Sequence, residues 1–250
     1  MIRIITLVTK LIAATLLASL FSSCKFSADF DGFGKSVKGS GNVTTETRTI
    51  SQPFTCIEAS NGLDIEVEQS NETMVEVIAD DNLQKEISTK VENGVLKITC
   101  TYSSFNNVKE HKVHVKMPKI DSLQAATGAN IKALNTLKGN AINVELSTAA
   151  EMDLELSYET IKSTCSSGSS LTVSGKALRF DGNASSGSDV DGENLLANEI
   201  MATASSGGEM TVHPILSLVA EASSGADISY TAVPKSLKKA VSSGGSIDEK

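Results

Sequence analysis

Three acidic residues in the second half of the chain are the side chains best placed to do chemistry. Asp189, Glu209 and Asp227 each stand two places after a glycine, at intervals of 20 and 18 residues. If these segments stack as neighbouring strands, the carboxylates lie about 5 Å apart and repel one another. Calcium, which prefers oxygen ligands, would relieve that repulsion. The pattern therefore has two interpretations, a calcium-binding rail or a solvated acidic rail that keeps the protein soluble.

The paired serines that precede these glycines lack the companions that catalysis needs. A serine nucleophile requires a base within reach, and no histidine recurs beside the pairs. His111 and His114 are three residues apart, which places them on opposite faces of a strand and argues against joint metal binding. We therefore expect no enzymatic activity, and no cofactor other than the calcium considered above.

Cysteine chemistry is similarly restricted. Cys56, Cys100 and Cys165 make an odd number in the part of the chain after Cys24, so a disulfide framework is not expected. One bridge, between Cys56 and Cys100, stays open from the sequence. Cys165 takes the place that alanine holds in later copies of a repeat, which predicts a small buried residue.

That repeat is a short turn that recurs through the second half of the chain. Ser-Ser-Gly occurs in five identical copies, with looser copies upstream, one of which has Ala149 in the glycine place, and an outlying relative near residue 61. The spacing is close to 19 residues, which is typical of one rung of a solenoid. Glycine enters the left-handed region at little cost, so each copy is expected to form a corner between two strands. The turn glycines are Gly62, Gly128, Gly168, Gly187, Gly207, Gly225 and Gly244.

The residues around each turn predict the elements that position the acidic column. Positions three after and seven before the glycine are apolar in every rung, as expected of stacked core ladders. Between them polar and apolar residues alternate, as in 152–156, and a period of two indicates strands. We predict an all-β fold, with a β-solenoid over residues 119–250 and a less regular β-rich part over residues 42–118. The last rung has no evident covering element, and an open edge invites pairing with another chain.

The beginning of the chain predicts export. Residues 1–23 have the basic start, apolar run and small final residues of a secretory signal peptide. The order resembles the lipobox of bacterial lipoproteins, so Cys24 is expected to carry a lipid anchor, with residues 24–41 as a flexible tether. The alternative is an ordinary signal cleavage with Cys24 incidental. Removing Arg3 and Lys10 takes the net charge from −8 to −10, which disfavours nucleic acid as a partner.

The segment from Phe54 to Val67, followed by the Ser-Ser-Gly copies, resembles the head GIN domain of auto-transporter adhesins, a family common in Bacteroidetes lipoproteins. The resemblance covers about residues 43–250. It implies a right-handed parallel β-helix without catalytic residues, a role in adhesion, and assembly as a homo-oligomer, with a trimer suggested. Ser-Ser-Gly stands here where family members often have Gly-Ser-Gly.

These observations favour a non-enzymatic outer membrane lipoprotein, facing the cell surface or the periplasm. The leading interpretation is an adhesin or surface scaffold that binds a glycan or protein ligand on a cell surface. A periplasmic structural or envelope-stress lipoprotein is the alternative. A polysaccharide-active β-helix enzyme comes third, because Arg48 and Arg179 have no evident acid-base companion in the sequence.

Overall fold

The computed structural model describes residues 35–250. The signal peptide expected over residues 1–23, the lipidation of Cys24 and the first part of the tether lie outside the described residues. No helix within the described range is long and apolar enough to cross a membrane.

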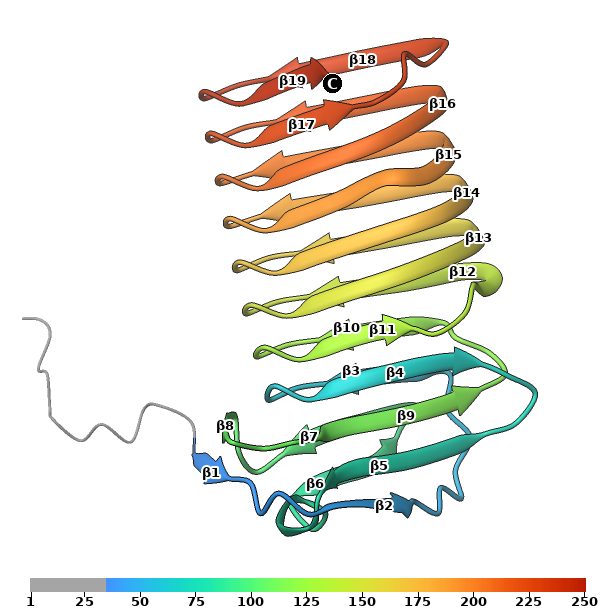
Figure 1. The fold of residues 1–250 in the computed structure, drawn as a ribbon. Helices are drawn as coiled ribbons and strands as arrows, with labels where there is room; N and C mark the ends of the chain where they lie inside the picture. The colour runs from blue at the N-terminus through green and yellow to red at the C-terminus, as the bar shows by residue number, and fades with distance from the viewer. Residues whose placement is uncertain (1–34) are drawn as a thin grey trace, which may run out of the picture. The chain divides into compact units, whose positions relative to one another are not determined.

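The described chain is a right-handed β-solenoid with turns about 19 residues apart, as the sequence predicts (Figure 1). Each regular rung has a strand that enters the Ser-Ser-Gly corner, a strand that leaves it, and a second, broader corner opposite, through which the longer strands continue without a break. The strands of these rungs are β10 (Ser122–Ala125), β11 (Asn130–Ala133), β12 (Leu137–Leu146), β13 (Glu151–Cys165), β14 (Ser170–Ser185), β15 (Asp189–Ser205), β16 (Glu209–Ala222), β17 (Asp227–Tyr230), β18 (Ser236–Val241) and β19 (Ser246–Glu249).

Parallel register between rungs builds the core. Met152 of β13 pairs with Leu171 of β14, which pairs with Val190 of β15, and all three are buried. Burial alternates along each strand, as the period of two in the sequence requires. Each fully buried side chain of this size contributes roughly 1.5–3 kcal/mol, so stacking on neighbouring rungs supplies the stability that one rung lacks.

The glycine corners hold two successive left-handed residues. At one corner Ser167 has φ 56° and Gly168 has φ 70°, so the serine before the glycine is also strained, which the sequence analysis did not anticipate. The N–H of Gly168 donates to the carbonyl of Ser186 on the next rung at 3.2 Å. Similar bonds join the other corners, so the turns stack as closely as the strands do. Ala149, the one departure from glycine in this column, is also left-handed, with φ 57°.

The solenoid begins earlier than residue 119, which corrects the predicted division of the chain. The strands β3 (Cys56–Ala59) and β4 (Asp64–Gln69) form a full rung around the Gly62 corner and pair in parallel with β10 and β11. A further rung is made by β7 (Val95–Cys100) and β9 (His111–Met117), which pair in parallel with β3 and β4. The intervening segment hides the 19-residue period in the sequence, although the stack is continuous.

Antiparallel strands cover the rung formed by β7 and β9 on the side away from β3 and β4, at the foot of the stack in Figure 1. Here β5 (Met74–Asp80) pairs with β9, β6 (Ile87–Glu92) pairs with β7, and β2 (Val43–Thr47) pairs with β5. A 3-10 helix, η1 (Asp81–Leu83), follows β5. The short β1 (Ser36–Lys38) pairs with β8 (Ser104–Asn106), so the flexible tether predicted to reach residue 41 does not extend to this part of the chain.

Candidate binding surface

The predicted acidic column is present on the outside of the solenoid. Asp189 pairs in register with Glu209, which pairs with Asp227, so the three carboxylates stand on adjacent strands and are exposed. Neighbouring residues still cover part of the Asp189 carboxyl, and this partial burial raises its pKa, as do the charges of Glu209 and Asp191. The hydroxyl of Ser246 donates a hydrogen bond to Asp227. Within residues 35–250 no group of three or more His, Cys, Asp or Glu side chains is arranged to hold a metal ion. Both interpretations of this column, the calcium rail and the solvated rail, therefore remain open to experiment.

His111 and His114 each lie beside a different carboxylate. His111 Nε2 lies 3.6 Å from a carboxylate oxygen of Asp64, and His114 Nε2 lies 3.3 Å from one of Glu68. Both carboxylates belong to β4, the neighbouring strand. Each histidine therefore has an acidic neighbour of its own, and the two do not share a site.

The described cysteines are all unbridged. Cys56 lies opposite Val95, and Cys100 stands five residues further along that strand, about 17 Å away at the usual rise per residue. A disulfide needs its Cα atoms within about 7 Å, so Cys56 and Cys100 do not pair. Cys165 is fully buried, and burial, helped by the charge of Asp189, raises its pKa to about 12. Its place as a small core residue is confirmed, and its thiol is not poised to react.

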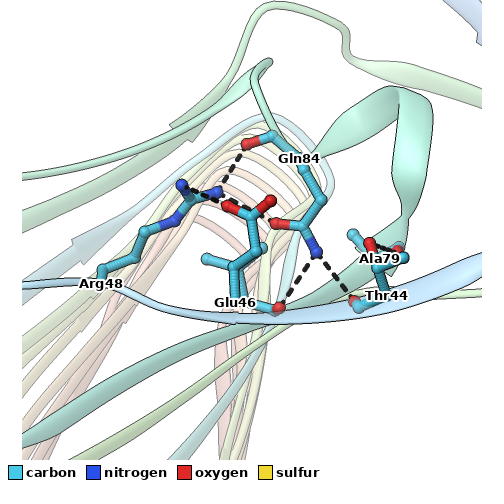
Figure 2. A network of polar contacts seen from close by, with 6 residues as sticks. Thr44, Glu46, Arg48, Ala79 and Gln84 are labelled. Carbon is cyan, nitrogen blue, oxygen red and sulfur yellow. Dashed lines mark hydrogen bonds and ion pairs between the residues drawn. The ribbon is translucent and has the colours of Figure 1, made fainter.

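Arg48 and Arg179, the two arginines of the described residues, both have acidic partners. Figure 2 shows Arg48 in a network that ties β2 to the segment after β5. Arg48 Nη2 donates to the backbone carbonyl of Gln84 at 2.6 Å, and Nη1 forms an ion pair with Glu46 at 2.9 Å. The Gln84 side-chain amide in turn donates to the carbonyl of Thr44 at 2.8 Å. Arg179 forms an ion pair with Glu199 at 3.0 Å. Both arginines have structural partners.

A feature that the sequence analysis missed lies along the broad corner opposite the glycines. Large apolar side chains are exposed there on four successive rungs, with Leu178 56% exposed, Leu196 46%, Ile215 43% and Val233 64%. We call Leu178, Leu196, Ile215, Leu216 and Val233 the apolar stripe. Single exposed apolar residues are ordinary, whereas exposed apolar residues gathered on successive rungs are typical of interaction surfaces.

Irregular strand pairing surrounds two residues of the stripe, Leu196 and Ile215. The register between β15 and β16 shifts between Gly192 and Leu196, and again between Ala197 and Glu199. Bulges of this kind redirect side chains away from the regular alternation. Leu178, Leu196 and Ile215 stand ten, nine and eight places after their glycines, so no fixed column marks them in the sequence. A search for apolar residues at outward-facing places, with the spacing allowed to vary, would have found them.

Beside the stripe the surface is hollowed over a volume of about 550 Å³. Its floor is Tyr158, whose hydroxyl donates to the carbonyl of Ile120 at 2.9 Å. The ring lies so close over Gly139 that a Cβ there would be 2.5 Å from the ring. Leu178, Leu196 and Ile215 form apolar walls, and Glu159, Lys176 and Asn198 add polar groups. Ser157, which pairs in register with Lys176, also lines the hollow.

The chain matches, over residues 53–234, the family described as "Putative auto-transporter adhesin, head GIN domain". A search of curated proteins finds no match.

Solved structures share the fold. A putative adhesin from Bacteroides fragilis is 18% identical, with a TM-score of 0.79, and the match covers 86% of this chain and all of that one. A putative adhesin from Parabacteroides merdae is 19% identical, with a TM-score of 0.69 over 87% of this chain and all of that one. A protein from Parabacteroides distasonis called a putative lipid binding protein is 20% identical, with a TM-score of 0.70 over 86% of this chain and all of its own.

At these identities the likeness concerns the fold alone. The family match covers well over half of the sequence and includes the rung around Gly62, the antiparallel strands β5 and β6, and most of the regular rungs. This chain belongs to the family of head GIN domain proteins described as putative auto-transporter adhesins.

Proposed function

We propose that this protein is a non-enzymatic lipoprotein of the cell envelope that adheres to a protein partner through the apolar stripe. The observation that carries the proposal is the exposure of Leu178, Leu196, Ile215 and Val233 on consecutive rungs. The family description and the names of two structural neighbours refer to adhesins, which supports the same function.

A protein partner suits this surface better than a glycan. Sugars are commonly bound on exposed aromatic rings, and this chain has no tryptophan and only 4% aromatic residues. Tyr158, the ring nearest the stripe, is buried beneath the hollow. Aliphatic side chains around a shallow hollow instead match the apolar centre of a protein interface, where a few buried anchors carry most of the affinity.

Attachment to the membrane follows from the beginning of the sequence. Acyl chains on Cys24, after removal of residues 1–23, would hold the solenoid at an outer membrane surface, because several chains together give stable anchoring. Radiolabelled palmitate incorporated by the wild type and absent from Cys24→Ala would support this step. Equal labelling of both would contradict it.

Adhesion is tested in cells that lack the gene and are complemented with defined variants. Leu178→Ser combined with Ile215→Ser removes two apolar anchors, whereas Met201→Ser removes a similarly exposed apolar residue outside the stripe. We expect the double variant to attach to target cells as poorly as the deletion strain, and Met201→Ser to attach like the wild type.

Protease added to intact cells tests on which side of the outer membrane the solenoid lies. A periplasmic protein serves as the control for envelope integrity. Digestion supports surface exposure. Protection of the full-length protein contradicts adhesion and supports a periplasmic structural role.

A further inference from the structure

The hollow beside the apolar stripe carries one cation and one anion on opposite sides of an apolar floor. Tyr158 and Ala177, which form this floor, pair in register and are both buried. Lys176 stands one residue before Ala177, and Glu159 stands one residue after Tyr158. Both charged side chains are exposed and line the hollow. Along the direction of the strands, the ammonium therefore lies before the floor and the carboxylate lies after it.

Neither of these two charges has an ionic partner inside the molecule. Within residues 35–250 no ion pair includes Lys176 or Glu159. By contrast, Arg179 and Glu199, which line a second hollow on the far side of Leu178, neutralise each other at 3.0 Å. Lys176 and Glu159 are thus available to charges that a partner brings.

The surroundings of Lys176 leave its side of the hollow cationic. Lys176 and Lys138 flank Ser157 in register, so two ammonium groups stand on either side of an uncharged residue. The acid before Ser157 on the same strand is Glu155, which accepts a hydrogen bond from Thr136 at 2.7 Å and does not line the hollow. A carboxylate from a partner would therefore be favoured on this side.

We propose that the hollow selects a partner segment in which a large apolar side chain stands between an acidic and a basic residue. This proposal rests on the function proposed above, because it concerns the same surface. The apolar side chain enters between Leu178 and Leu196, the acid faces Lys176, and the base faces Glu159. The apolar anchor supplies most of the affinity. The charges fix the direction of the segment, since a reversed segment would place like charges together.

The two charges together exclude simpler partner segments. A segment with acids on both sides of the anchor would meet Glu159, and one with bases on both sides would meet Lys176. The volume of about 550 Å³ lies within the range of about 300–1,000 Å³ that is usual for ligand pockets, so a large side chain can enter. Asn198, which also lines the hollow, can both donate and accept hydrogen bonds with the backbone of the segment.

The test uses a random peptide library displayed on phage, with immobilised mature protein as the bait. A second bait combines Lys176→Glu with Glu159→Lys, which reverses the order of the charges and keeps the net charge. We expect peptides selected on the wild type to carry an acid and a base in one order around a large apolar residue. Peptides selected on the second bait should carry them in the opposite order.

Fluorescence anisotropy with one peptide selected on the wild type measures each charge separately. Exposed ion pairs contribute modestly, so Lys176→Gln and Glu159→Gln should each weaken binding about three-fold. Lys132→Gln should bind like the wild type, because Lys132 is an exposed lysine of β11 that does not line the hollow. Circular dichroism verifies folding, and these single variants decide the question if the charge-reversed protein does not fold.

The same peptides separate this proposal from the proposed function. Peptides that require Leu178 and Ile215 but show no charge order, or the same order on both baits, would overturn the charge selection and leave adhesion through the apolar stripe standing. Peptides that bind Leu178→Ser with Ile215→Ser as well as they bind the wild type would overturn both proposals. A library that yields no binder on the wild type would also overturn both.

Discussion

The carboxylate of Asp80 accepts a hydrogen bond from the backbone N–H of Gly41 at 2.8 Å. Its other oxygen accepts from the N–H groups of Lys109 at 3.1 Å and Glu110 at 3.3 Å. Asp80 therefore joins three segments: the stretch before β2, the end of β5 and the loop before β9. Gly39 packs so tightly against this carboxylate that a Cβ there would lie 2.4 Å from it.

Replacing Asp80 should destabilise the protein. Asp80→Ala leaves three backbone donors without their partner in a buried place, so we expect a loss of about 2–4 kcal/mol in the free energy of unfolding. Asp81→Ala removes an exposed carboxylate next in sequence and is the matched control, expected to change stability by less than about 1 kcal/mol. Urea denaturation of both variants measures the difference. Equal losses from both would contradict the special role of Asp80.

The same carboxylate predicts a dependence on pH. Burial alone would raise the pKa of Asp80, but the N–H donations from Gly41, Glu110 and Lys109, with the charge of Lys109, outweigh burial and lower it below 3.8. An acid whose folded pKa is lowered stabilises the folded state above its unfolded pKa, and this stability is lost as pH falls through the folded pKa. The melting temperature of the wild type should therefore fall below about pH 4 more steeply than that of Asp80→Asn.

The acidic column predicts the opposite sign. The pKa of Asp189 is raised, so ionisation of this group opposes folding once the pH exceeds the unfolded pKa near 3.9. Asp189→Asn should raise the melting temperature at pH 7 and have little effect at pH 3. Asp153→Asn, at an exposed place on β13, two strands away, is a control. A lower melting temperature for Asp189→Asn at pH 7 would contradict the repulsion.

Calcium separates the two interpretations of this column. We expect a solvated acidic rail, because Ser246 already donates to Asp227 and the three carboxylates lie on an open surface. Calcium added to a chelator-treated sample should then leave the melting temperature unchanged. A rise that Asp189→Asn and Glu209→Gln both abolish would instead establish calcium binding.

Ala149 offers a stabilising substitution. A non-glycine residue in the left-handed region costs about 1–2 kcal/mol. Glycine avoids this strain but loses more backbone entropy on folding, which offsets part of the gain. Ala149→Gly should raise the free energy of unfolding by about 0.5–1 kcal/mol, while Gly168→Ala, the reverse change one rung later, should lower it. Thermal denaturation of the two variants checks the sign, and a loss from Ala149→Gly would contradict the strain.

The repeat made most of the fold predictable, because each rung presents the same spacing of glycine and apolar residues. Gly62 shows the limit: its rung is separated from the next by the segment around β5 and β9, so only spatial register reveals that they stack.

The apolar stripe was less predictable than the acidic column. Asp189 and Glu209 keep a fixed offset from their glycines, whereas bulges shift Leu196 and Ile215 relative to theirs. Periodicity in a sequence reveals strands that pair regularly. Residues whose position depends on irregular pairing are therefore not detected from periodicity.

The measurement that tests the central claim most directly is binding of fluorescently labelled mature protein to target cells by flow cytometry. Two leucine-sized anchors contribute roughly 1.5–3 kcal/mol each when fully buried, so Leu178→Ser with Ile215→Ser should weaken binding by more than about a hundred-fold. Met201→Ser should bind like the wild type, and trypsin treatment of the target cells should remove the binding. Undiminished binding of the folded double variant, or binding that survives removal of target surface proteins, would contradict adhesion to a protein through the apolar stripe.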